Sequence, residues 1–130
     1  MKDYVVDLEI AKELKENGFQ QESEFYWQDV RWKNKYGKFG GLELRNSNKG
    51  VNTAHVYSAP TSDKILKELP VSISIDNKTY CLEIHKIYID EDCIHQGYIV
   101  RYEDKIFDNG KLSNALAKMW LYLKKGGYIK

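Results

Sequence analysis

The sequence has few of the features that stabilise secreted or metal-binding domains. Its 130 residues include two cysteines, Cys81 and Cys93, and no close C-x-x-C pair. A disulfide framework or a common structural zinc site therefore has no support. Neither is needed, since a chain of this length can bury roughly two-thirds of the surface that its unfolded form exposes. We expect a single domain over residues 1–130, with reduced cysteines and no metal or cofactor.

Long apolar runs are also missing. No stretch approaches the ~18 apolar residues that a membrane-spanning helix needs. Met1 leads directly into Lys2 and Asp3, so the apolar region of a signal peptide is absent. These two absences predict a cytoplasmic protein that does not enter a membrane.

An excess of positive charge is absent as well. Lys and Arg number 20 and Asp and Glu 19, which gives a formal net charge of +1. Proteins that bind nucleic acid usually show a clearly basic balance or stripe, because neutralising phosphates supplies most of their affinity. The sequence therefore disfavours a nucleic-acid partner.

Aromatic residues, in contrast, are abundant: 10 Tyr, 4 Phe and 3 Trp, or 13% of the chain. Aromatic side chains favour strands and contribute strongly to cores and interfaces alike. Apolar and charged residues make up 42% and 30%, as in ordinary globular proteins. The composition predicts a folded, β-rich core and leaves some rings available for a partner.

Two early segments have the features of helices. Residues 7–18 show apolar side chains at helical spacing, with Asp7 as the N-cap and Gly18 suited to the left-handed position after the last turn. Residues 61–69 form a shorter helix that Pro70 stops. Its expected cap is Thr61 or Ser62. Its expected buried side chains are Ile65, Leu66 and Leu69.

The closing helix, residues 112–125, gives the strongest signal in the chain. Ser113 is its expected cap and Leu112 the preceding staple residue, while Gly126 and Gly127 end it. A helix this apolar must pack on a sheet or on another helix. Its expected buried stripe consists of Ala115, Leu116, Met119, Trp120 and Leu123.

The other segments show the alternation and the residue types of strands. The clearest feature is a hairpin around Asn77, with arms at residues 71–75 and 79–89, that opens an antiparallel meander. The predicted class is α+β: an N-terminal helix, an antiparallel curved sheet with a short intervening helix, and a C-terminal amphipathic helix packed on the sheet. Further strands are expected at residues 23–32, 42–45, 51–57 and 96–103, and a loop at residues 33–41.

Four segments stand out as words: LEIAKELKENGF (8–19), FYW (25–27), YSAPTSDKILKELP (57–70) and LSNALAKMWLYLKKGGYI (112–129). Together, and in this order, they resemble a widespread group of small phage and prophage proteins of gut and other low-GC bacteria. One departure is Gln20, because the group has proline after the glycine–aromatic pair. The resemblance implies a phage or prophage accessory protein in the cytoplasm of a bacterial host. It carries over no catalytic or ligand residues.

Metal binding and nucleophilic catalysis have weak support. Cys93 and His95 fall on one strand face, with Cys81 and His85 not far away in sequence, yet the ligand spacing of a zinc site is absent. Reduced structural cysteines explain this pattern better. An enzyme that uses Cys93 and His95 stays open as an alternative, although no nucleophile elbow or similar signature accompanies these residues.

Residues 36–41, with the sequence YGKFGG, form a glycine-rich basic loop. A glycine loop that binds a nucleotide lies between a strand and a helix, whereas a strand-like segment follows here. The tip of a hairpin is the better interpretation, although backbone amides in such a loop can hold an anion.

The aromatic residues near the first expected strand give the best candidate binding surface. Tyr26 and Trp32 share one face of that strand and Trp27 takes the other. One buried face cannot absorb both sets of rings, so either helices cover both faces or one face is exposed for a partner. The candidate surface joins this strand to the glycine-rich loop. It consists of Tyr26, Trp27, Trp32, Tyr36, Lys38, Gly40 and Gly41.

We therefore expect a non-enzymatic protein that binds a host or phage protein, with self-association as a further option. An alternative of another class is capture of a small, nucleotide-like ligand in a cleft beside the glycine-rich loop. A small cysteine/histidine enzyme is the third alternative.

Overall fold

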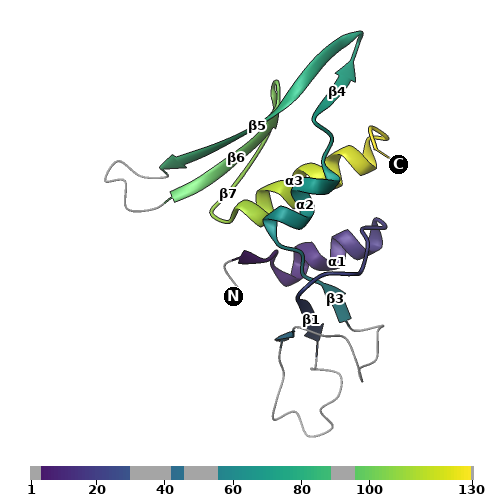
Figure 1. Cartoon of the computed structure of the whole chain (residues 1–130), viewed down its shortest axis with the longest axis vertical. Helices are drawn as coiled ribbons and strands as arrows, with labels where there is room; N and C mark the ends of the chain where they lie inside the picture. The colour runs from purple at the N-terminus through teal and green to yellow at the C-terminus, as the bar shows by residue number, and fades with distance from the viewer. Residues whose placement is uncertain (1–3, 30–41, 46–55, 89–95, 130) are drawn as a thin grey trace, which may run out of the picture.

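The computed structural model describes residues 4–29, 42–45, 56–88 and 96–129. These residues form helices and antiparallel sheets, which confirms the predicted α+β class (Figure 1). The helices are α1 (Leu8–Glu16), α2 (Ser62–Glu68) and α3 (Leu112–Lys125). The strands are β1 (Tyr26–Asp29), β2 (Leu42–Arg45), β3 (Val56–Ser58), β4 (Ser72–Ile75), β5 (Lys78–Tyr88), β6 (Gln96–Tyr102) and β7 (Lys105–Asn109).

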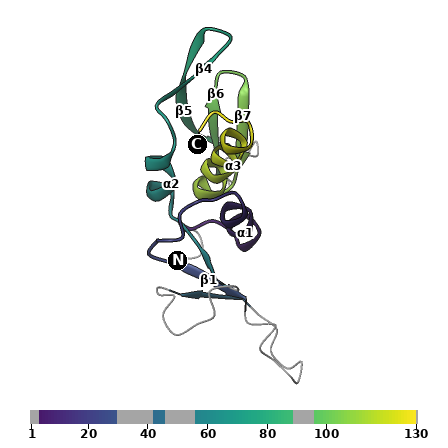
Figure 2. The same ribbon diagram turned by 90° about the vertical axis from the view of Figure 1, so that its right-hand side faces the viewer.

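The strands divide between two antiparallel sheets. One has the order β2-β1-β3, and the other is a meander in which β4, β5, β6 and β7 follow one another in chain order. Helix α3 packs against β6 and β7, and both α1 and α2 pack against α3. The helices consequently form a layer between the larger sheet and the smaller one (Figures 1 and 2).

The predicted hairpin around Asn77 is confirmed. Asp76 and Asn77 have φ angles of 51° and 67°, and Ile75 pairs with Lys78 across them. A two-residue hairpin turn of this type needs positive φ at both positions, which Asp and Asn tolerate better than most residues. The turn chemistry therefore fixes the register of β4 on β5.

Strand β7 is an element for which the sequence gives no clear signal. No strand is predicted after residue 103, yet Lys105–Asn109 pairs with β6. The two strands are joined by a two-residue turn in which Glu103 has a φ of 54°. Because glycine and asparagine are the usual residues for that conformation, Glu103 and Asp104 do not look like a hairpin turn.

Helix α3 has the predicted bounds and forms the centre of the core. All of its predicted stripe is buried, and Ala117 and Leu121 on neighbouring faces are buried too. The reason is that α1, α2 and the larger sheet surround it. Phe19 packs edge-on against Trp120, with ring centroids 5.0 Å apart.

The predicted cap of α3 is wrong. Lys111 is the N-cap, and Leu112 and Ser113 lie inside the first turn. The Ser113 side chain is buried, and its Oγ has no hydrogen-bond partner among the described residues. Asn109, the last residue of β7, bonds to the backbone just before the helix instead: its Oδ1 accepts from the N–H of Lys111 at 2.9 Å. The capping preference of Ser113 therefore does not decide how the helix begins, because Asn109 makes the hydrogen bond at this position.

Helix α1 ends as predicted but begins differently. Gly18 has a φ of 86°, its N–H donates to Lys15 O, and the N–H of Phe19 donates to Leu14 O at 2.9 Å. These are the two bonds of a Schellman motif. Asp7 does occupy the N-cap position, but its side chain makes no capping bond. The Asp7 carboxylate instead accepts hydrogen bonds from Lys111 and Asn114, at the start of α3.

Helix α2 confirms the predicted cap and corrects one buried residue. Thr61 Oγ1 accepts from the backbone N–H of Lys64 at 3.5 Å. Ile65 and Leu69 are buried as expected, whereas Leu66 is exposed. Leu66 lies about 100° around the helix from Ile65, beyond the narrow stripe that faces α3.

None of the helices in the described ranges is long and apolar enough to cross a bilayer.

Candidate functional site

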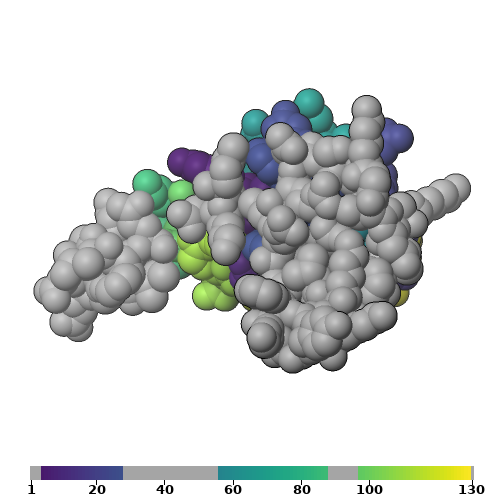
Figure 3. All heavy atoms as spheres, turned by 90° about the horizontal axis from the view of Figure 1, so that it is seen from below, coloured from purple at the N-terminus to yellow at the C-terminus, as the bar shows by residue number. Residues whose placement is uncertain are grey.

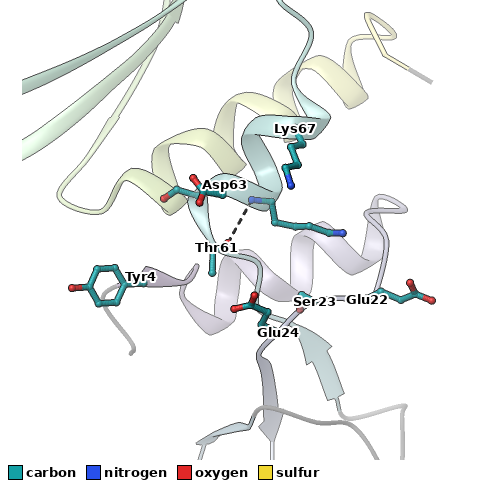
Figure 4. Close-up of a pocket in the computed structure, with 9 residues that line it drawn as sticks. Tyr4, Glu22, Ser23, Glu24, Thr61, Asp63 and Lys67 are labelled. Atoms are coloured by element: carbon teal, nitrogen blue, oxygen red, sulfur yellow. Dashed lines mark hydrogen bonds between the residues drawn. The ribbon is translucent and has the colours of Figure 1, made fainter.

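A polar cleft lies between the segment that precedes β1 and the start of α2. Its volume is about 690 Å³ and it opens to solvent. Figure 4 shows Tyr4 and Asp63 at one end and Glu22 at the other, with Lys67 above and Glu24 below. The lining consists of Tyr4, Glu22, Ser23, Glu24, Thr61, Ser62, Asp63, Lys64 and Lys67.

The wall that contains Glu22 and Glu24 is fixed by hydrogen bonds to β3. Gln21 Oε1 accepts from the backbone N–H of Ser58 at 2.9 Å. Ser58 Oγ donates to Ser23 Oγ at 2.7 Å, and Ser23 Oγ donates in turn to the carbonyl of Phe25 at 2.6 Å. The segment before β1 is therefore held in place although it is neither helix nor strand. The view from below shows its blue atoms beside teal atoms of the β3–α2 region (Figure 3).

The opposite wall is built at the start of α2. Thr61 caps the helix and also forms a β-bridge with Val5. Val5 and Val6 are fully buried, so the N-terminal segment is anchored against the core. This anchoring brings Tyr4 to the mouth of the cleft, where 68% of its surface remains exposed.

Charged side chains of both signs surround the cleft. Within the described residues, none of them forms an ion pair, although charges elsewhere do, as in Lys111–Asp7 and Lys125–Glu13. Three carboxylates and two ammonium groups therefore stand around one opening without neutralising one another. They are Glu22, Glu24, Asp63, Lys64 and Lys67.

This arrangement suits a polar, charged partner better than an apolar small molecule. Pockets for small ligands are mostly apolar and bury most of the ligand. Here the walls are polar and the cleft is open, and the single aromatic ring of the lining, Tyr4, stands at its edge. Tyrosine is over-represented at protein interfaces because its ring gives a large contact area and its hydroxyl stays hydrated.

The predicted aromatic surface falls only partly within the described residues. Tyr26 and Trp27 are buried, and Trp27 Nε1 donates to the carbonyl of Val6 at 2.7 Å. Their burial supports the alternative in which core packing accounts for rings on both faces of the strand. The other members of the predicted surface lie outside the described residues. These are Trp32, Tyr36, Lys38, Gly40 and Gly41.

Of the residues considered for metal binding or thiol chemistry, likewise, only some belong to the described part of the chain. Cys81 is exposed on β5, and His85 lies 3.7 Å from Glu83. A hydrogen bond from Arg101 Nε, at 2.8 Å, lowers the pKa of Glu83. In the ranges that the structure describes, no three metal-ligating side chains gather. Cys93 and His95 lie outside those ranges, so the enzyme alternative stays a prediction.

Sequence reasoning did not single out the cleft. Thr61 is predicted only as a cap of the short helix, and the sequence pattern gives Tyr4, Glu22 and Glu24 no role. No local pattern could have found them, because the walls meet only through long-range contacts. The bond between Ser58 and Ser23, for example, spans 35 positions.

Comparison with protein-family models, with curated proteins and with solved structures gives no match.

Proposed function

We propose that this chain is a phage or prophage accessory protein that acts by binding a host or phage protein, without catalysing a reaction. The polar cleft is its contact surface. One observation carries the proposal: an exposed tyrosine and five charged side chains line the same cleft, and these charges form no ion pairs within the described residues. Tyrosine is enriched among the residues that dominate binding energy at protein interfaces, and charges that a partner can complement give specificity. The four segments that resemble phage proteins support the proposed origin.

The charges indicate what the partner must supply. A partner would complement Lys64 and Lys67 with carboxylates, and would complement the acidic side chains around the same opening with lysine or arginine. A protein surface readily presents both signs within a short distance.

A nucleotide-like ligand fits the cleft less well. Its phosphates would meet the two lysines and its base could stack on Tyr4, but three carboxylates line the same cleft. Like charges at close range cost binding energy. The carboxylates therefore favour a protein over a polyanion.

The test is capture of a partner from lysogenic or infected host cells by tagged protein, followed by affinity measurement on the purified pair. Tyr4→Ala should weaken binding about 10-fold or more, as loss of an aromatic anchor does. The double variant Lys64→Glu, Lys67→Glu should weaken it further. Lys78→Glu changes an exposed lysine at the hairpin turn, far from the lining, and serves as the matched control.

Two results would contradict the proposal. One is a partner that binds the cleft variants and the wild-type chain equally well, with unfolding temperatures unchanged. The other is native mass spectrometry that finds a bound small molecule whose retention depends on Lys64 and Lys67, with no protein partner.

A further inference from the structure

Strand β5 has an edge that its neighbour covers only in part. β5 runs from Lys78 to Tyr88, but β4 pairs only with its first residues, from Lys78 to Cys81. One further bond, from the N–H of Leu82 to Val71 O at 2.9 Å, ends this pairing. Beyond Leu82, no strand in the described ranges pairs with this side of β5. Figure 1 shows β5 continuing well past the beginning of β4.

The register determines which backbone groups point to that edge. Ile75 and Lys78 flank a two-residue turn and are therefore a hydrogen-bonded pair. Because bonded and non-bonded positions alternate, Leu82 also points toward β4, as its bond to Val71 shows. By the same alternation the N–H and C=O groups of Ile84 and Lys86 point to the uncovered edge. Their neighbour His85 pairs with Ile99 on the other side.

The side chains along this edge give it chemical character. Val71, at the end of the covered part, is 82% exposed, and Ile84, where the open part begins, is 38% exposed. Lys86 follows two positions later on the same face as Ile84 and is also exposed. The edge therefore presents two apolar side chains, then a positive charge.

We propose that this open edge of β5 binds an extended segment of a partner protein by strand addition. The segment runs antiparallel to β5 and continues the line of β4, and its backbone bonds to Ile84 and Lys86. Cross-strand complementarity requires an apolar residue opposite Ile84 and an acidic residue opposite Lys86. This site lies outside the polar cleft and does not depend on the function proposed for it.

A second copy of the chain is the competing occupant, and charge argues against it. Two copies of β5 that pair antiparallel over Ile84 to Tyr88 place Lys86 of one copy opposite Lys86 of the other. Like charges directly opposite destabilise a strand pair. A lysine on a sheet edge is also a common means by which proteins avoid self-association. The same lysine attracts an acidic segment.

The first experiment measures amide hydrogen exchange by NMR in the free chain. The amides of Ile84 and Lys86 should exchange at least about 100-fold faster than that of His85, because only His85 lies in a bonded ladder. Equal protection of all three would mean that the edge is already covered, and would overturn the proposal.

The second experiment measures binding of two short synthetic peptides by fluorescence anisotropy. Both alternate threonine with isoleucine, and they differ in carrying either glutamate or lysine at the position opposite Lys86. The glutamate peptide should bind the wild-type chain about 2- to 5-fold more tightly, and Lys86→Glu should reverse that order. Identical affinities for the two peptides, or no binding by either, would overturn the proposal.

A proline variant separates backbone pairing from charge. Lys86→Pro removes an N–H that points to the open edge, where proline is tolerated in a sheet, so the fold should survive. It should abolish peptide binding, whereas Lys86→Ala keeps the N–H and should retain most of it. If Lys86→Pro unfolds, the reversed peptide preference expected of Lys86→Glu still tests the proposal. Dimers of the wild-type chain in sedimentation that Lys86→Pro dissolves would assign the edge to a second copy instead.

Discussion

Asp7 and Asn114 are bonded to each other twice across 107 positions of the sequence. The backbone N–H of Asp7 donates to Asn114 Oδ1, and Asn114 Nδ2 donates to Asp7 Oδ2, both at 2.9 Å. Asn114 is buried in the first turn of α3, and Asp7 stands at the start of α1. The pair therefore fixes the two helix starts together. Through Val6 and Val5 it also holds the segment that carries Tyr4 to the cleft.

Replacing Asn114 by alanine should destabilise the fold. Asn114→Ala leaves the N–H of Asp7 without its partner in a partly buried place, which costs about 1–3 kcal/mol in free energy of unfolding. Chemical denaturation measures this loss. Asn17→Ala removes an exposed hydrogen bond to Glu13 O and is the control, expected within about 0.5 kcal/mol of wild type. Equal effects of the two substitutions would show that the pair does not hold the helix starts.

The stability of the fold should fall in acid partly through Asp7. Partial burial raises the pKa of Asp7, but hydrogen bonds from Lys111 and Asn114 and the nearby positive charges outweigh it, so the pKa lies below its ordinary 3.8. A carboxyl group with a lowered pKa contributes stability above its unfolded pKa and loses it as pH falls through the folded one. The difference in unfolding free energy between wild type and Asp7→Asn should therefore shrink below about pH 4. A constant difference from pH 7 to pH 2 would contradict this.

The hydroxyl of Tyr102 should contribute to stability from within the core. It donates to the carbonyl of Pro70 at 2.5 Å, and burial raises the pKa of Tyr102 to about 12. Tyr102→Phe should cost about 1–2 kcal/mol because the carbonyl loses its partner. Tyr98→Phe, on the same face of β6, is the matched control and should change little. Because the pKa is raised, the contribution of Tyr102 is full below pH 10 and is lost as pH approaches 12. Equal effects of the two substitutions at neutral pH would rule out this role.

Two glycines give a matched test of backbone conformation. Gly18 has a φ of 86° at the end of α1, and among the described residues no atom outside its own stretch of backbone lies within 4 Å of where a Cβ would stand. Gly18→Ala should thus cost about 1 kcal/mol through conformation alone. Gly110 has equally open space and no positive φ, so Gly110→Ala should be neutral or slightly stabilising. Thermal unfolding of both variants measures the difference, and a Gly18→Ala protein as stable as wild type would contradict the Schellman ending.

The elements that could be predicted are those fixed by neighbouring residues. The bounds of α3 follow from its apolar spacing and the glycines after it, and the Asn77 turn follows from residues that tolerate positive φ. The end of α1 at Gly18 is of the same kind. In each case the determining chemistry lies within a few positions of the chain.

The features that could not be predicted depend on distant residues. Asp7 has the residue type of a cap, but its side chain is bonded to Asn114. Ser113 has it too, but lies buried inside the first turn, and Asn109 bonds to the N–H of Lys111 instead. The cleft arises in the same way, from the bridge between Val5 and Thr61 and from bonds between β3 and the segment before β1. No local sequence pattern encodes contacts between segments so far apart in the chain.

The most direct test of the proposed function is hydrogen exchange of the chain alone and in complex with its captured partner. Residues 22–24 lie outside helices and strands, and residues 61–64 form the cap and first turn of α2. Among the described residues, the amides of Ser23 and Lys64 are bonded only to side-chain oxygens, those of Tyr26 and Thr61, so both segments should exchange faster in the free chain than the core of the helices does. If the cleft binds the partner, both segments should exchange several-fold more slowly in the complex, and Tyr4→Ala should reduce that protection. A stable complex in which residues 22–24 and 61–64 exchange as fast as in the free chain would show that the partner binds elsewhere.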